Sequence, residues 1–173
     1  MGIPVEKIVK LASNENPLGM SPRARGAVEA AISGVERYPD QFELIGAVAE
    51  RCGVAQNQVV LGHGSNDVLD LIARVFLAPG RSAVFAQHAF AVYPLATLST
   101  GAELIATPAK NYGHDLAVMR AAIRPDTRLV WVAHPNTPTG NFLPSPEART
   151  FPEASPQHVV LVLHQTHKNT LPP

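Results

Sequence analysis

The sequence has one cysteine, no excess of either charge and no long apolar run. Cys52 is the single cysteine among 173 residues, so the chain cannot close an internal disulfide, as is typical of a reducing cytoplasm. The longest apolar runs, such as residues 159–163, are far shorter than the ~20 residues that span a membrane. No apolar stretch of the signal-peptide kind follows Lys7. We therefore expect a cytoplasmic protein without a membrane partner.

The charge balance also bears on partners. The 14 basic and 14 acidic side chains cancel, whereas proteins that bind nucleic acid usually carry a basic excess, so we expect no nucleic-acid partner. Hydrophobic residues make up 46% of the chain, which favours a folded core over disorder. Proline is abundant, and eight of the 16 prolines lie in residues 135–173. Because proline breaks helices and strands, we expect a regular front and an irregular back.

Apolar periodicity predicts an arm and then alternating strands and helices. Residues 1–20 are turn-rich, and Ser21-Pro22 and Asp40 are typical helix starts. In the second helix Ile45, Val48 and Cys52 share one face, so we expect Cys52 to be buried. The remaining pattern predicts an α/β fold with a mainly parallel sheet. The expected strands are 58–61, 82–86, 103–107, 128–133 and 159–163, and the expected helices are 65–77, 90–100, 115–123 and an interrupted one at 145–156.

Ligands of such sheets bind at the carboxyl ends of the strands, and two loops there are distinctive. Residues 62–67, Gly-His-Gly-Ser-Asn-Asp, lead directly into a helix, whose first amides and dipole favour a phosphate. An ordinary capped helix is the alternative interpretation. A dinucleotide loop would need a third glycine where Asp67 stands. Residues 134–140 contain two prolines and a glycine, which predict a rigid turn suited to a site.

Six motifs in order give a more specific indication. The chain resembles pyridoxal-phosphate aminotransferases of fold type I, and within them it is most similar to histidinol-phosphate aminotransferases. The resemblance covers nearly the whole chain and corresponds to the N-terminal half of such an enzyme. The motifs are Leu-Ala-Ser-Asn-Glu-Asn-Pro-Leu-Gly at 11–19, Arg-Tyr-Pro-Asp at 37–40, the loop at 62–67, Phe-Ala-Val-Tyr-Pro at 90–94, Tyr-Gly-His-Asp at 112–115 and Pro-Asn-Thr-Pro-Thr-Gly at 135–140.

The resemblance implies an incomplete large domain of the fold type I PLP-transferases. Residues 1–53 would form an N-terminal arm and small-domain helices, and residues 54–173 the front part of the cofactor-binding domain. The family works as a homodimer on small-molecule substrates with pyridoxal 5′-phosphate. The implied reaction moves an amino group between glutamate and imidazole-acetol phosphate in histidine biosynthesis.

The family's cofactor contacts map onto particular residues. Gly64, Ser65 and Asn66 would hold the cofactor phosphate, in agreement with the helix-start argument. Phe90 would stack on the pyridine ring, with core packing as the alternative. Tyr38 would reach the phosphate of the neighbouring subunit's cofactor.

Other positions complete the expected site or depart from it. Asn14 and Asn16 lie in the arm that helps to close the substrate site. Thr137 stands where the family has the asparagine that binds the phenolic oxygen. His164 replaces the aspartate that pairs with the pyridine nitrogen and makes the ring an electron sink, and His167 replaces a tyrosine.

The family's Schiff-base lysine has no counterpart among Lys7, Lys10, Lys110 and Lys168. We therefore expect no transamination by this chain and, with added pyridoxal phosphate, no yellow aldimine that borohydride fixes. The alternatives are a non-catalytic remnant with a phosphate-binding loop, or part of another fold type I enzyme such as an aromatic aminotransferase or a phosphothreonine decarboxylase. A zinc site at His158, His164 and His167 is a weaker alternative. We also expect an open sheet edge at residues 159–163 and poor solubility.

Overall fold

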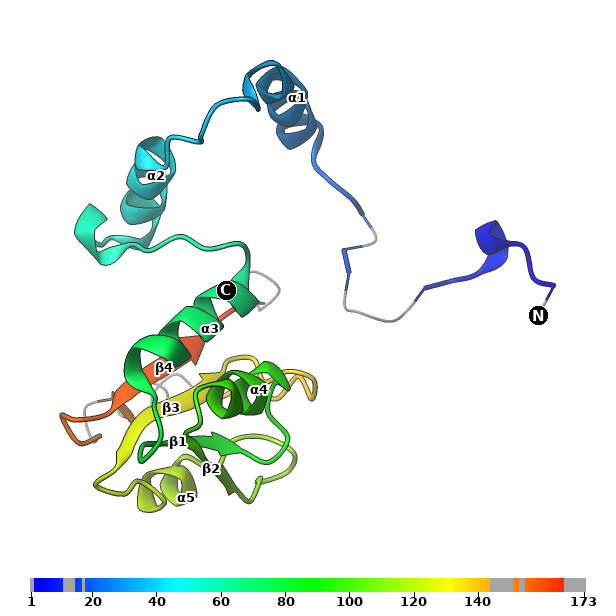
Figure 1. Ribbon diagram of the computed structural model, residues 1–173. Coiled ribbons are helices and arrows are strands. Elements are labelled where there is room, and N and C mark those ends of the chain that lie inside the picture. Colours follow the sequence, from blue (N-terminus) through cyan, green and yellow to red (C-terminus); the bar gives the residue numbers. More distant parts are fainter. Residues whose placement is uncertain (1, 11–14, 17, 144–150, 153–154, 167–173) are drawn as a thin grey trace. The chain divides into compact units, whose positions relative to one another are not determined.

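The computed structural model describes all residues except 1, 11–14, 17, 144–150, 153–154 and 167–173 (Figure 1). The chain divides into two compact units, residues 1–59 and residues 60–173. The expected boundary after residue 53 concerns domains of the complete family fold and stays a prediction. In the described residues, no helix combines the length and the apolar character that crossing a membrane requires.

The described residues of the first unit form two α-helices and three short 3-10 turns. Ser21 caps the first helix through its side chain, which accepts a hydrogen bond from the amide of Ala24, and proline follows at the first helical position. Gly53 ends the second helix with φ 66°, a conformation that favours glycine. Both helices agree with the sequence prediction. The elements are η1 (Val5–Lys7), α1 (Pro22–Ala31), η2 (Ile32–Gly34), α2 (Phe42–Cys52) and η3 (Gln56–Gln58).

The prediction that Cys52 is a core residue is wrong, because its side chain is exposed. The shared helical face was identified correctly, but a face is buried only where another element covers it. Within this unit α1 has no buried residue, and Ala49 is the single buried residue of α2. Apolar periodicity therefore found the helix and not its burial.

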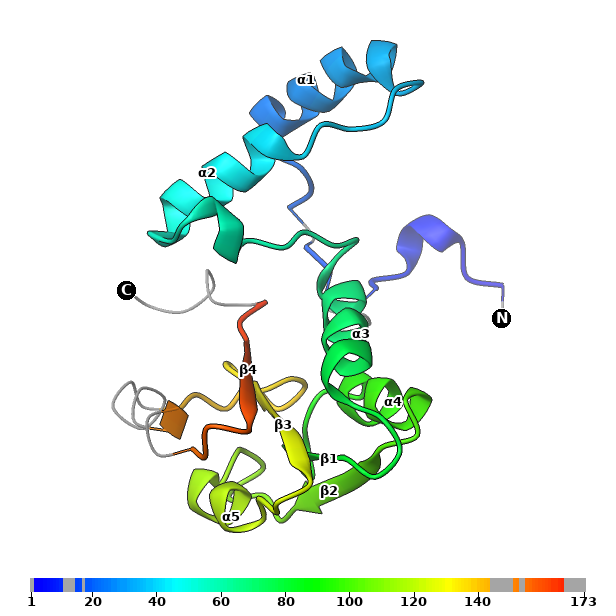
Figure 2. The same ribbon diagram turned by 60° about the vertical axis from the view of Figure 1, so that its left-hand side comes forward.

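In its described residues, the second unit is a four-stranded parallel sheet with helices on both faces (Figures 1 and 2). The strand order is β2-β1-β3-β4, and every adjacent pair is parallel. The α/β prediction is thereby confirmed. The elements are α3 (Ser65–Phe76), β1 (Ser82–Ala86), α4 (Val92–Ser99), β2 (Glu103–Thr107), α5 (Leu116–Ala121), β3 (Thr127–Ala133) and β4 (Val160–His164).

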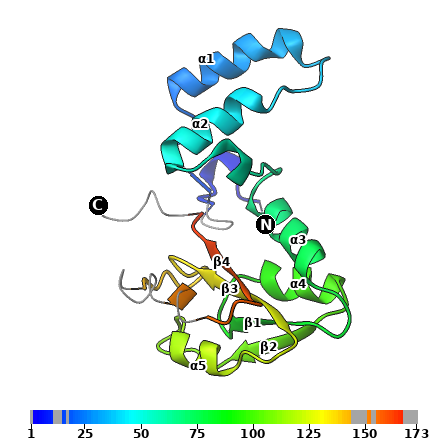
Figure 3. The same ribbon diagram turned by 90° about the vertical axis from the view of Figure 1, so that its left-hand side faces the viewer.

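Alternate residues of the central strands supply two apolar cores. Helices α3 and α4 cover one face, where they pack on Phe85, Leu129 and Trp131 (Figure 3). Helix α5 covers the other face, where Met119 packs with Val130. Both faces of β1 and β3 are buried, as in other parallel sheets. The central strands are therefore held firmly, and the loops at their carboxyl ends are built on a rigid base.

Two predicted elements are not among the helices and strands named above. The strand expected at 58–61 is wrong: Gln58 ends η3, and residues 59–61 pair with no strand in the described part of the chain. A β-strand needs a neighbour for its backbone hydrogen bonds, which apolar residues alone do not provide. The interrupted helix expected at 145–156 falls mostly outside the described residues.

Candidate functional site at the carboxyl edge of the sheet

The start of α3 lies in a tight loop that its own side chains close. The backbone amide of His63 donates to Asp67 Oδ2 at 2.9 Å, and the amide of Gly64 donates to the carbonyl of Gly62 at 2.9 Å. Gly64 precedes the helix with φ 87° and has no side chain to cap it. The first amides of α3 have no intrahelical acceptor, so they are available to an anion.

The carboxylate of Asp67 therefore stabilises the loop before α3. Its carboxylate turns back onto the loop, and a Cβ atom at Gly62 would lie only 2.9 Å from Asp67 Oδ2 and 2.8 Å from Val68 Cγ2. A side chain at position 62 would therefore have to displace Asp67 or Val68. The carboxylate thereby holds the loop in shape for the amides that follow.

The end of β4 forms a second part of the candidate site, after the loop before α3. The hydroxyl of Tyr93, from α4, lies 3.0 Å from Nδ1 of His164, the last residue of β4. Thr166 Oγ1 is hydrogen-bonded to the other ring nitrogen, Nε2. Tyr93 has no exposed surface, and burial raises the pKa of its phenol well above its usual range. The phenol therefore keeps its proton.

Aromatic rings hold Tyr93 and His164 in place. The rings of Tyr93 and Trp131 are stacked, with centroids 5.3 Å apart and planes 5° apart. Phe90 meets Tyr93 edge-on at 5.9 Å and lies 5.5 Å from the His164 ring. Trp131 in turn donates from Nε1 to Thr97 Oγ1 at 3.3 Å. These contacts fix the position of the His164 imidazole.

A third part is a brace between the loops that follow β1, β2 and β3. Asn136 Nδ2 donates to the carbonyl of His88 at 3.0 Å, to the carbonyl of Tyr112 at 3.3 Å and to Thr139 Oγ1 at 2.7 Å. Thr139 Oγ1 also donates to the carbonyl of Tyr112 at 3.0 Å. Asn136 is 3% exposed, and its Oδ1 has no hydrogen-bond partner within the described structure. One buried amide thus links three loops.

Two further histidines lie beneath these loops. His114 is buried, and its Nε2 lies 2.9 Å from the carbonyl oxygen and 3.2 Å from the amide nitrogen of Ala133. Desolvation lowers the pKa of His114, and the neighbouring His134 lowers it further. Burial likewise lowers the pKa of His134, whose Nδ1 accepts from the amide of Leu143 at 3.3 Å. Both side chains are therefore neutral supports of the backbone.

The predicted residues of the second unit lie around this edge. Ser65 and Asn66 begin α3, Phe90 packs against the core shared by α3 and α4, and His164 ends β4. Thr137 is partly exposed in the loop after β3. The structure brings Phe90 and His164 together. Gly64 precedes α3, and its amide donates to the carbonyl of Gly62. The roles assigned to these six residues stay predictions.

The remaining predicted residues belong to the arm or lie outside the described part. Tyr38 of the first unit is fully exposed. The side chain of Asn16 closes a local turn, in which its Oδ1 accepts from the amide of Leu18 and its Nδ2 donates to the carbonyl of Gly19. Asn14 and His167 lie outside the described residues.

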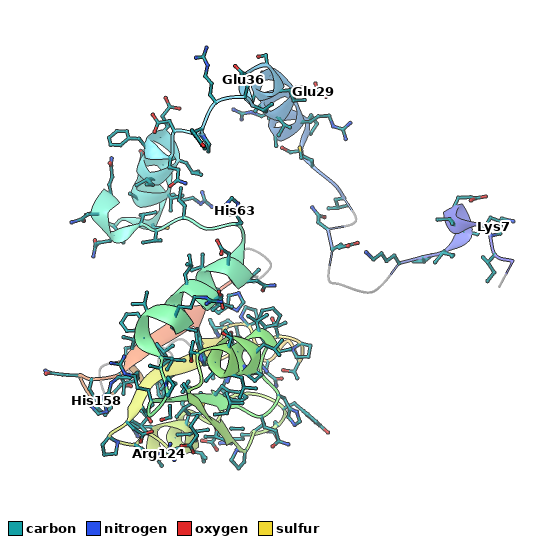
Figure 4. All side chains as sticks on the ribbon, in the orientation of Figure 1. Lys7, Glu29, Glu36, His63, Arg124 and His158 are labelled. Carbon is teal, nitrogen blue, oxygen red and sulfur yellow. The ribbon has the colours of Figure 1, made fainter. Side chains whose placement is uncertain are left out.

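The histidines expected near each other for a zinc site are partly separated by β4. His158 lies before the strand, next to the carbonyl of Arg124, whereas His164 ends the strand. Figure 4 shows Arg124 and His158 at the end of the second unit away from His63. Among the described residues, no group of three histidine, cysteine or acidic side chains could hold a metal ion.

Sequence reasoning missed Tyr93 and Asn136. Tyr93 follows Phe90 by three residues, so the pair of aromatic residues after a strand end was an available signal. Asn136 gave no such signal, because its partners His88 and Tyr112 are 48 and 24 residues away in the sequence.

Comparison with known proteins identifies the relatives of this fold. The sequence model of the family described as aminotransferase class I and II matches residues 6–171. Over all 173 residues the chain is 80% identical to histidinol-phosphate aminotransferase 1 of Dechloromonas aromatica, of which it covers 48%. It is 53% identical over 175 aligned residues to histidinol-phosphate aminotransferase 2 of Nitrosospira multiformis, of which it covers 45%. The chain thus spans about half the length of these curated relatives.

A solved structure is similar over most of the chain. The crystal structure of histidinol-phosphate aminotransferase from Sinorhizobium meliloti in complex with pyridoxal-5′-phosphate superposes with a TM-score of 0.89 at 25% sequence identity. The similarity covers 92% of this chain and 44% of that one.

Proposed function

Because the chain belongs to the class I and II aminotransferase family, we propose that it is the part of a histidinol-phosphate aminotransferase that holds the phosphate of pyridoxal phosphate. The relatives' reaction would be the transfer of an amino group between glutamate and imidazole-acetol phosphate, in a homodimer in which Tyr38 would contribute across the subunit interface. The 80% identity to a relative of that name supports this substrate over those of other fold type I enzymes.

The start of α3 is the observation that carries the proposal. Ser65 and Asn66 offer backbone amides and polar side chains at the positive end of a helix that no side chain of Gly64 caps. Asp67 is turned away into its bond with the amide of His63. A dianionic phosphate monoester fits this donor set.

The residues that would face the pyridine ring of the cofactor do not fit amino transfer. An electron-sink pyridine needs a carboxylate at its nitrogen, and the matching residue here is His164. Of the four lysines, Lys7 and Lys10 belong to the first unit, Lys110 lies in the loop after β2 and Lys168 is outside the described residues. We therefore propose that this chain on its own binds the phosphate without catalysing amino transfer.

Substitution of Ser65 tests the phosphate site. Pyridoxine 5′-phosphate is the suitable probe, because its alcohol cannot form a Schiff base with any lysine. Equilibrium dialysis should show that Ser65→Ala weakens binding by about tenfold or more, as expected for the loss of one hydrogen bond to a charged group. Ser33→Ala, an exposed serine of the first unit, is the matched control. Equal affinity of the wild type and Ser65→Ala would contradict the proposal.

A further inference from the structure

The loop that follows β3, residues 134–143, is closed at its base by a buried imidazole. His134 is 7% exposed, and its Nδ1 accepts a hydrogen bond from the backbone amide of Leu143 at 3.3 Å. Phe142 lies against the same ring, with centroids 4.6 Å apart. Leu143 in turn belongs to the apolar core that α5 covers. His134 and Leu143 therefore join the two ends of the loop.

The hydrogen bond of His134 fixes the charge of its ring. An imidazolium carries hydrogens on both nitrogens and has no acceptor, so Nδ1 can accept from the Leu143 amide only while the ring is neutral. Protonation would bring two N–H groups against each other, and the bond at the base of the loop would break. Desolvation lowers the pKa of His134, in agreement with a neutral ring.

A second buried imidazole supports the strand end from which the loop starts. Nε2 of His114 lies 2.9 Å from the carbonyl oxygen of Ala133, the last residue of β3. Its Nδ1 is buried and has no hydrogen-bond partner in the described part of the chain. An additional proton on Nδ1 would thus be a buried N–H without an acceptor, which is costly. Burial and the neighbouring His134 lower the pKa of His114, so both rings resist protonation while the loop is closed.

The tip of the loop is tied to the turn before α5 by hydrogen bonds that contain no titratable group. Asn141 Nδ2 donates to the carbonyl of Asn111 at 2.9 Å, and Thr139 Oγ1 donates to the carbonyl of Tyr112 at 3.0 Å. Asn111 and Tyr112 have φ values of 51° and 63°, which residues other than glycine adopt rarely. Opening of the loop at its base would therefore also release a strained turn.

Other charges bear little on the two rings. None of the described ion pairs joins a carboxylate to His114 or His134. Asp115, next to His114, uses its carboxylate to accept from the amide of Val118 at the start of α5. The titratable and charged side chains of the described elements around the rings are those of His88, Lys110, Asp115, Arg120 and His164.

We propose that His134 and His114 form an acid-sensitive clasp, which releases the loop at residues 134–143 from the edge of the sheet when the two imidazoles become protonated. In the open loop the rings meet water and regain the proton affinity of an ordinary histidine, so acidification below about pH 6.5 favours opening. Above that pH both rings are neutral and the loop stays closed. The clasp does not depend on the proposed phosphate site, which lies at the start of α3.

Hydrogen–deuterium exchange of the full chain, followed by mass spectrometry at pH 7.5 and pH 5.0, tests the clasp. After correction for the intrinsic pH dependence of amide exchange, protection of the peptide covering residues 134–143 should fall by about tenfold or more at pH 5.0. The peptide that contains the buried strand β1 should stay protected at both pH values. Unchanged protection of the loop, or loss of protection in both peptides together, would overturn the inference.

His134→Asn separates the charge of the side chain from its hydrogen bond. Asparagine Oδ1 is attached to Cγ, as Nδ1 is in histidine, so it can accept from the Leu143 amide but does not titrate. This variant should keep the loop protected at pH 5.0. His158→Asn, at an exposed histidine, should lose protection as the wild type does. An equal loss in His134→Asn would contradict the role of its imidazole.

An NMR titration of the wild type gives a second measurement that needs no variant. The Cε1–H chemical shifts of His114 and His134 report protonation, and the pH at which they change should coincide with the pH at which the loop loses protection. Protonated rings in a loop that remains protected, or an open loop with neutral rings, would count against the clasp.

Discussion

Buried polar side chains set the geometry of the carboxyl edge. Asn136 uses one amide group to join loops that follow three different strands, and His114 supports the backbone of β3 from below. Such groups are expensive to bury and therefore must be paired. Tyr93 and His164 follow the same rule, because each supplies the partner of the other.

Removal of the Asn136 amide should loosen the loop brace. Asn136→Ala leaves the carbonyls of His88 and Tyr112 without this donor, so the free energy of unfolding should fall by about 2 kcal/mol. Urea denaturation measures this change. Asn57→Ala, at an exposed asparagine of η3, is the control and should be neutral. A loss no larger than that of the control would show that the brace does not contribute.

The buried histidines predict a pH dependence of stability. The pKa of His114 is lowered in the folded state by burial, so the unfolded chain binds more protons as the pH falls below about 6.5. The free energy of unfolding should therefore be greatest above that pH and decrease on acidification through the folded-state pKa. Urea denaturation at pH 8 and pH 5 should show a smaller pH effect in His114→Gln than in the wild type. The same reduction in His158→Gln, an exposed histidine, would argue against His114 as the cause.

At the scale of elements, the start of α3 shows how a helix is fixed by what precedes it. Gly62 approaches α3 so closely that a Cβ would meet Val68 Cγ2 at 2.8 Å. Asp67 ties the same loop through the amide of His63. The orientation of the first helical turn, and with it the proposed phosphate site, depends on these two contacts.

Gly62→Ala should therefore displace the start of α3. We expect a loss of about 1–3 kcal/mol in the free energy of unfolding, as for other substitutions that overfill a packed site. Binding of pyridoxine 5′-phosphate should weaken in the same variant. Gly26→Ala in α1, where nothing lies within 4 Å of the added Cβ, is the control and should be neutral or slightly stabilising. A Gly62→Ala chain that binds the probe as well as the wild type would contradict this account.

At the scale of the whole molecule, β2 and β4 are the outer strands of the sheet in the described residues. In the described part of the chain β4 pairs with β3 alone. A strand edge without a partner promotes association between chains. Exposed apolar side chains of the first unit, among them Val35 and Phe42, act in the same direction.

We expect the chain to self-associate through β4. Leu163 is 39% exposed on this edge strand, and Leu163→Lys should reduce association because a charged edge resists pairing. Light scattering across a concentration series measures the effect. Val54→Lys places the same charge on an exposed apolar residue away from the sheet and should change association less. A wild-type chain that stays monomeric with a sharp, reversible thermal transition would contradict this expectation.

From Ser65 to Ala133, the sequence by itself determined the order of helices and strands. The runs at 82–86 and 103–107 were predicted with the bounds that β1 and β2 have, since short apolar runs between turn residues leave few alternatives. The cap of α5 at Asp115 was equally local, because its side chain accepts from the amide of Val118. Local hydrogen bonds and apolar periodicity depend on residues close together in the sequence, so they can be predicted from the sequence.

Tertiary structure alone decided which side chains are buried, which strands pair and which distant residues meet at the carboxyl edge of the sheet. Cys52 had the right helical face, yet its side chain is exposed, and residues 59–61 had apolar side chains but pair with no strand among the described residues. Tyr93 lies 3.0 Å from Nδ1 of His164 across 71 residues of sequence. These properties depend on which distant groups exclude water or supply a hydrogen-bond partner, and the chain's own local pattern does not contain that information.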